Sequence, residues 1–264
     1  MLKIESIGQG RTLLWLHDWG FDPQIWTHQV DFFRPRYRNL LVNYNLPEPP
    51  EGIAYDGLLA HLCRDIRAQW PADAGPPLAI LASGLGSFLA YELIELGWQP
   101  ATLVLFGGLV RFTNEGEYLS GLPREKVAAM RKALHEQPQK MLARYRRLAF
   151  EPEERLVPRE LWQRAPSQGQ AFLKLAFDAM ITHDYQEFLP ALEVRALVVQ
   201  GEADQVAPVW QGQLLRRLLR RSEFLLLPGA GHLPFVTHYA NLNRRIARFL
   251  ESPVAESPAE SPAE

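Results

Sequence analysis

The chain has 264 residues, of which 47% are hydrophobic and 22% charged, and its formal net charge is −2. A chain of this length can bury roughly three quarters of its unfolded surface, so its core needs no disulfide. The slight acidity argues against non-specific binding of nucleic acid. No apolar run approaches the roughly 20 residues of a membrane span, and the start of the sequence has no signal-peptide pattern. We therefore expect a soluble cytoplasmic protein without nucleic-acid or membrane partners.

The only cysteine, Cys63, lies in a helical stretch, where a lone thiol is typical of a small core residue rather than of a nucleophile. The sequence has no spacing of His, Cys, Asp or Glu that is typical of a metal site. Neither a metal nor a cofactor is expected.

The first part of the chain alternates short apolar runs with amphipathic stretches. The predicted strands are 11–16, 39–43, 78–82 and 101–106, and the predicted helices are 21–33, 55–70 and 85–97. Asp22 and Pro23 form a cap and first turn for the first of these helices. This alternation predicts an α/β fold with a mostly parallel sheet, helices on both faces and a ligand site at the carboxyl ends of the strands.

The alternation stops between Arg111 and Pro190, where only helical segments are predicted, at 124–135, 139–150 and 168–183. An all-helical insertion in an α/β chain is typical of a lid over the site. We therefore predict a lid at 111–190 and a core made of 1–110 and 191–251.

The α/β pattern then resumes. Strands are predicted at 196–200 and 224–227, and helices at 209–220 and 238–251. The last residues, 252–264, repeat Glu-Ser-Pro with alanine and have one large apolar side chain, so this tail is expected to be disordered.

The stretch from Leu78 to Ala90 has the pattern that presents a nucleophile in α/β enzymes: an apolar strand, a tight turn of small residues and a helix. In the order small, any, nucleophile, any, small, the turn reads Ala82-Ser83-Gly84-Leu85-Gly86. Glycine therefore stands where a serine, cysteine or aspartate is expected. We predict a positive φ at Gly84, which a glycine adopts without the strain that another residue would carry.

Two further residues follow predicted strands: Asp204, and His232 in a glycine-rich loop. A carboxylate that orients an imidazole is the arrangement of general acid–base catalysis. The order nucleophile, acid, histidine is that of the α/β-hydrolases. The chain resembles this superfamily and, within it, the carboxylesterases of biotin synthesis that cleave the methyl ester of pimeloyl-acyl carrier protein. The resemblance is carried by four motifs: His17-Asp18-Trp19-Gly20, the turn at Gly84, 201–208 and 231–235.

The resemblance implies an α/β-hydrolase fold, a His232–Asp204 pair, and an oxyanion hole formed by the backbone N–H groups of Trp19 and Leu85. It also implies that the lid receives an acyl carrier protein, and the positions that match the family's binding residues are Arg144, Tyr145, Arg147, Arg155 and Arg159. Residues 124–147 contain eight basic side chains and two acidic ones. Such a stretch can steer an acidic partner, but a solvated helix face has the same composition.

The chain departs from the family pattern at three places. Gly84 replaces the serine, Asp18 replaces the second glycine of the first motif, and 43–50 replaces a glycine-rich loop. The first change removes the acyl-enzyme route. We therefore predict a non-hydrolytic or impaired homologue, a pseudoenzyme, that binds a small acyl or ester ligand or an acyl carrier protein under its lid, with His232 facing an empty space at Gly84.

Two alternatives keep activity. His232, oriented by Asp204, can activate a water for ester hydrolysis, or Ser83 can replace the missing nucleophile, although its side chain is expected to point away from His232. His232 can also be a purely structural loop residue bonded to Asp204. A glycine introduced at position 84 to trap a substrate would give the same sequence.

Overall fold

A computed structural model describes residues 2–117, 120–163 and 168–252. The predicted tail therefore lies outside the described residues, except for Ser252. The centre of the fold is a seven-stranded sheet with the order β1-β3-β2-β4-β5-β6-β7. The strands are β1 Lys3–Ile7, β2 Arg11–Leu16, β3 Tyr37–Asn43, β4 Ala79–Ser83, β5 Thr102–Phe106, β6 Arg195–Gly201 and β7 Ser222–Leu227. All neighbours pair in parallel except β1 and β3.

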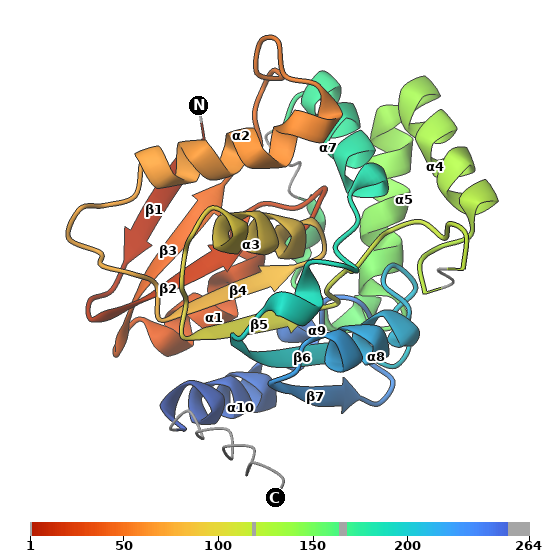
Figure 1. Ribbon diagram of the computed structural model, residues 1–264. Coiled ribbons are helices and arrows are strands. Elements are labelled where there is room, and N and C mark those ends of the chain that lie inside the picture. The colour runs from red at the N-terminus through yellow and green to blue at the C-terminus, as the bar shows by residue number, and fades with distance from the viewer. Residues whose placement is uncertain (1, 118–119, 164–167, 253–264) are drawn as a thin grey trace, which may run out of the picture.

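The central strands are continuous apolar runs because both faces of the sheet are covered. Every residue of β4 and β5 is buried. Helices α2 (Tyr55–Ala68) and α3 (Leu85–Glu95) pack together over one face, and α1 (Thr27–Phe33) and α10 (Tyr239–Glu251) lie together over the other (Figure 1). This architecture confirms the predicted mostly parallel α/β fold.

The insertion between β5 and β6 contains helices α4 (Arg124–Glu136), α5 (Pro138–Phe150), α6 (Arg159–Gln163) and α7 (Gln170–Thr182). Helices α4, α5 and α7 stand beside one another at one end of the sheet (Figure 1). Short 3₁₀ turns, η2 (Glu154–Leu156) and η3 (Leu189–Ala191), belong to the same segment. The remaining helices are α8 (Val209–Leu218) and α9 (Pro234–Thr237).

Three details differ from the sequence-based prediction. Strand β1 was not predicted, because it is an edge strand with no fully buried residue and so has no apolar run. The helix predicted over 21–33 is a 3₁₀ turn, η1 (Pro23–Trp26), followed by α1, and Asp22 caps η1 through its side chain. The predicted closing helix is α10, and a short separate helix that was not predicted, α9, precedes it.

Candidate functional site

The turn between β4 and α3 has the predicted backbone. Gly84 has φ 49° and ψ −117° and is the N-cap of α3, which confirms the expected positive φ. The backbone of Gly84 is as predicted, but the space in front of this residue is not empty. A Cβ built on Gly84 would lie 1.7 Å from Oδ1 and 2.2 Å from Cγ of Asp18.

The prediction of an empty space in front of His232 is therefore wrong, because the Asp18 carboxylate fills it. Asp18 Oδ1 accepts a hydrogen bond from the Leu85 N–H at 2.8 Å. Asp18 Oδ2 accepts one from the Tyr145 hydroxyl at 2.6 Å and lies 3.3 Å from Nε2 of His232. The Asp18 side chain is fully buried. A carboxylate from the loop after β2 thus occupies the space that a side chain at position 84 would take.

His232 and Asp204 form the predicted contact. Nδ1 of His232 lies 2.8 Å from Oδ2 of Asp204, and both side chains are buried. Asp204 Oδ1 accepts hydrogen bonds from the backbone N–H groups of Val206 and Ala207, each at 2.8 Å. Gln200 donates to Oδ2 at 3.1 Å. The Asp204 carboxylate that orients the imidazole is therefore held in place by hydrogen bonds that do not involve His232.

The imidazole of His232 lies between two carboxylates, Asp204 and Asp18. Burial alone would lower the pKa of His232, but the charge of Asp204 and the hydrogen bonds to Asp18 and Asp204 outweigh it and raise this pKa to about 10. His232 is therefore an imidazolium at neutral pH. Both ring nitrogens then carry a proton, and neither can accept one from a substrate or a water.

His17, in the same loop as Asp18, has the opposite environment. Burial lowers the pKa of His17 to about 4, although the carbonyl of Asp18 and nearby carboxylates oppose this shift. Its ring stacks on Tyr44, with 3.9 Å between the ring centroids, and the Tyr44 hydroxyl donates to the His17 carbonyl. Neutral His17 and its stacked partner hold the loop that carries Asp18.

Of the two proposed oxyanion donors, the Leu85 N–H points at Asp18 Oδ1, so the protein's own carboxylate uses it. The side chain of Trp19 contacts the inserted helices, since its Nε1 donates to the carbonyl of Leu173 on α7 at 3.0 Å. The role of the Trp19 N–H as a donor stays a prediction. Ser83 is buried, and within the described residues its hydroxyl has no hydrogen-bond partner.

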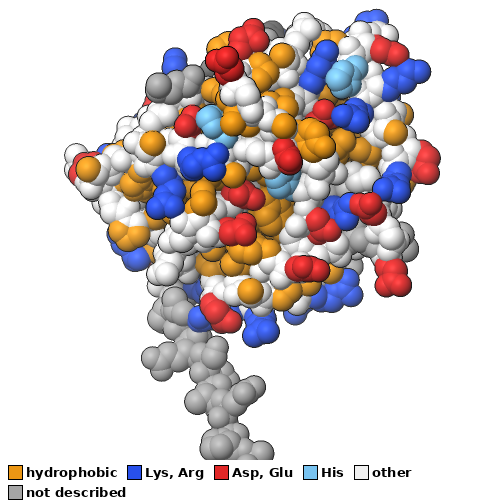
Figure 2. All heavy atoms as spheres, turned by 45° about the horizontal axis from the view of Figure 1, so that its top comes forward, with side chains coloured by type: hydrophobic (Ala, Val, Ile, Leu, Met, Phe, Trp, Pro, Cys, Tyr) orange, Lys and Arg blue, Asp and Glu red, His pale blue; other side chains and the backbone are white. Residues whose placement is uncertain are grey.

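The predicted partner-binding positions divide into two groups. Tyr145 is buried, and its hydroxyl binds Asp18, so it belongs to the site. The side chains of Arg144, Arg147, Arg155 and Arg159 are exposed on the helical segment between β5 and β6. The face that brings α2, α7 and α4 forward carries acidic and basic side chains interspersed (Figure 2). Several bases of 124–147 have acidic neighbours: Arg124 pairs with Glu115, Arg131 with Asp178, and Arg147 with Glu151.

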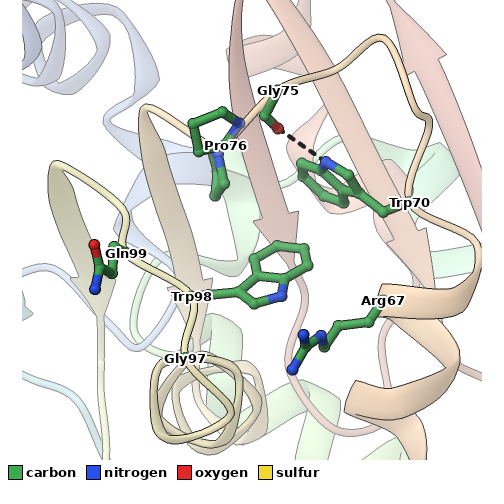
Figure 3. A pocket seen from close by; sticks show the side chains of 8 residues that line it. Arg67, Trp70, Gly75, Pro76, Gly97, Trp98 and Gln99 are labelled. Carbon is green, nitrogen blue, oxygen red and sulfur yellow. Dashed lines mark hydrogen bonds between the residues drawn. The ribbon is translucent and has the colours of Figure 1, made fainter.

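A separate pocket of about 480 Å³ lies at the amino ends of β4 and β5, away from Asp18. Its walls include the indoles of Trp70 and Trp98, which meet edge to face with 4.5 Å between centroids (Figure 3). Nε1 of Trp70 donates to the Gly75 carbonyl, and Arg67 binds the Leu96 carbonyl. This pocket shares no residue with the Asp18 site.

Within the described ranges, no group of three or more His, Cys, Asp or Glu side chains is arranged to hold a metal ion. None of the helices that the structure describes is long and apolar enough to cross a bilayer.

Comparison with known proteins gives consistent results. A family model described as "Alpha/beta hydrolase family" matches residues 13–245. The AB hydrolase superfamily protein YisY of Bacillus subtilis (strain 168) is 26% identical over 261 residues, covering 95% of this chain and 96% of that protein. A pimeloyl-[acyl-carrier protein] methyl ester esterase of Methylococcus capsulatus is 28% identical, covering 95% and 99%. The solved esterase EaEST from Exiguobacterium antarcticum superimposes with a TM-score of 0.79 at 20% identity, covering 95% and 96%.

Proposed function

The chain belongs to the alpha/beta hydrolase family, and from this premise we propose that it binds an acyl or ester ligand, or an acyl carrier protein, without forming an acyl-enzyme. The observation that carries the proposal is the Asp18 carboxylate, which fills the space that a side chain at position 84 would take and accepts a hydrogen bond from the Leu85 N–H. A cytoplasmic location and the lid boundaries at 111–190 stay predictions.

The Asp18 carboxylate is well satisfied, which favours a resting role over a reactive one. It is buried and receives donors from Leu85, Tyr145 and His232 on its two oxygens. A buried carboxylate is stable only when it is paired and hydrogen-bonded in this way. These bonds lower the reactivity of its lone pairs, so the geometry favours a closed, occupied site.

The two active alternatives have less support. Activation of a water by His232 needs a neutral imidazole and a free space beside it, but His232 is held as a cation and Asp18 fills that space. Ser83 would need a base, and the described contacts of the His232 ring nitrogens are to Asp204 and Asp18. We therefore place the binding function first.

The contacts between lid and core suggest where a ligand would lie. Tyr145 on α5 meets Trp19 edge to face, with 4.7 Å between ring centroids, and Phe177 on α7 lies 5.3 Å from the same indole. These rings and Phe21 are buried between lid and core. A ligand under the lid would displace them from one another and contact mainly apolar surface.

An acyl carrier protein is the proposed protein partner, on the strength of relatives named pimeloyl-[acyl-carrier protein] methyl ester esterase. The exposed arginines at 144, 147, 155 and 159 would receive its acidic surface. We expect Arg144→Glu with Arg155→Glu to weaken binding of an acyl carrier protein at least tenfold in a titration at low salt. An unchanged affinity would contradict this part of the proposal.

Restoring both family residues tests the central claim. The double variant Asp18→Gly with Gly84→Ser should hydrolyse short p-nitrophenyl esters, whereas Gly84→Ser alone should not, because its side chain would overlap Asp18. The native protein should not react with a serine-directed fluorophosphonate. Labelling of the native protein, or its turnover of esters, would overturn the proposal.

A further inference from the structure

Three hydrogen-bond donors from separate parts of the chain converge on one carboxylate. The Leu85 N–H comes from the start of α3, the Tyr145 hydroxyl from α5, and His232 Nε2 from the loop after β7. They lie 2.8, 2.6 and 3.3 Å from the two oxygens of Asp18. Together they supply one backbone amide, one phenol and one imidazolium.

These donors are positioned by contacts that do not involve Asp18. The Leu85 amide is fixed by the first turn of α3, where Ser87 N donates to the Gly84 carbonyl. His232 keeps its bond to Asp204. Tyr145 packs against Trp19. The positions of the three donor groups would therefore persist if the Asp18 side chain moved away, and a carboxylate in its place would again supply the negative charge that favours the imidazolium of His232.

Resting on the proposed function, we infer that the ligand of this site is a carboxylic acid in its ionised form, whose carboxylate replaces that of Asp18 when the lid opens. Asp18 is then an internal occupant that the ligand must displace.

The donors favour a carboxylate over an ester. A carboxylate presents two charged oxygens, so it can accept from all three donors, and such charge-assisted bonds are roughly twice as strong as neutral ones. An ester carbonyl is uncharged and offers one good acceptor oxygen. Placed beside the imidazolium of His232, an ester would leave that cation facing only one carboxylate, Asp204.

The surroundings of the donors favour a hydrocarbon body for the acid. Trp19, Phe21 and Phe177 are each at most 2% exposed; Trp19 and Phe21 lie against the ring of Tyr145, and Phe177 lies against the indole of Trp19. Rings of this kind bury apolar surface and offer few polar groups. A medium-chain monocarboxylate is therefore a suitable probe.

The first experiment uses Asp18→Gly, which removes the internal carboxylate and leaves the donors. We expect sodium formate, added at tens of millimolar, to raise the Tm of this variant by about 2 °C or more. Formamide, a neutral molecule of the same shape, and sodium chloride should not do so. Asp18→Asn is the matched control, since its amide fills the same space and should abolish the response.

A second experiment compares heptanoate with methyl heptanoate by calorimetric titration of the native chain and of Asp18→Gly. We expect both proteins to bind heptanoate, the variant at least about tenfold more tightly because no internal group competes, and both to bind the methyl ester more weakly. Equal affinity for acid and ester, or a formate response that chloride reproduces, would overturn the inference. Asp18→Ala replaces Asp18→Gly if the glycine variant does not fold.

The two proposals can fail separately. Fluorophosphonate labelling of the native protein would overturn the proposed function, whatever the response to formate. A missing formate response in a folded Asp18 variant, with no labelling of the native chain, would overturn only the assignment of a carboxylate ligand.

Discussion

Asp18 and residue 84 compete for one small volume. A β-carbon at position 84 would lie within bonding distance of Asp18 Oδ1, so the native chain can place a side chain there from only one of the two loops. The backbone adds a second constraint, because φ at Gly84 is +49° and a side chain at this conformation is strained by roughly 1–3 kcal/mol. Glycine at position 84 satisfies both constraints.

The steric exclusion predicts coupling between the two positions. Gly84→Ala should lower the free energy of unfolding by about 3 kcal/mol or more, because it adds backbone strain and forces the Asp18 carboxylate from its donors. In the Asp18→Gly background the same change should cost only the strain. A double-mutant cycle measured by urea denaturation should give a coupling of about 1 kcal/mol or more, and additive effects would contradict the described geometry.

The Tyr145 hydroxyl is one of the donors that hold the buried Asp18 carboxylate. Tyr145→Phe removes a donor from a buried carboxylate and should cost about 2 kcal/mol in urea denaturation. Tyr239→Phe is the control, because Tyr239 is 41% exposed and should change stability by less than about 0.5 kcal/mol. Similar losses in the two variants would argue against the Tyr145–Asp18 bond.

The sequence was sufficient to predict the backbone of Gly84 and to single out His232 and Asp204. It did not identify Asp18 as the residue that fills the site. The signal was present as two separate departures, an acid at position 18 and a glycine at position 84. Only the adjacency of β2 and β4 in the sheet shows that these departures meet in one volume.

The segment between β5 and β6 is held by a buried contact with the core and by an exposed ion pair between two of its own helices. Glu153, after α5, accepts from the Gly231 N–H and the Thr237 hydroxyl, each at 3.0 Å, and its side chain is only 11% exposed. Arg131 on α4 binds Asp178 on α7 with two hydrogen bonds, but its side chain is 50% exposed. Glu153 therefore couples this segment to the loop that carries His232.

These two links predict different losses of stability. Glu153→Ala should cost about 1–3 kcal/mol, since it leaves the Gly231 N–H without its partner. Arg131→Ala should cost at most about 1 kcal/mol, as is usual for exposed ion pairs. Hydrogen exchange in α5 should accelerate in the first variant and stay near the native rate in the second. The opposite order would show that the ion pair between α4 and α7 contributes more to stability than the buried contacts of Glu153.

Helices and strands were predictable where one face of the element, or every residue in it, is buried. The buried parallel strands and the long amphipathic helices follow directly from their apolar patterns. Strand β1 escaped prediction because pairing with β3, rather than burial, defines it. The break between η1 and α1 also has no apolar signature, since both segments contribute buried residues to the same core.

For the whole molecule, two buried histidines shape the dependence of stability on pH in opposite directions. The pKa of His232 is raised from 6.5 to about 10, so its contribution is complete below pH 6.5 and is lost as the pH rises toward 10. The pKa of His17 is lowered to about 4, so the unfolded chain takes up the proton first and stability falls as the pH drops below 6.5.

We therefore expect the Tm of the native protein to be highest near pH 6.5 and to decline on both sides between pH 4.5 and 10. Asp18→Asn removes one of the two carboxylates beside His232 and should flatten the alkaline decline. Its acid decline should persist, because His17 is unchanged. An alkaline decline that is equally steep in Asp18→Asn would show that His232 does not depend on Asp18.

The shared volume at Gly84 also constrains the order in which substitutions at positions 18 and 84 are tolerated. In a chain with serine at 84 and glycine at 18, an Asp18 carboxylate placed as it is now would collide with the serine side chain. A path through glycine at both positions avoids this collision. Starting from Asp18 and Gly84, a serine at 84 is accommodated only if the Asp18 carboxylate is removed as well. A substitution at position 18 therefore makes the glycine at position 84 hard to replace.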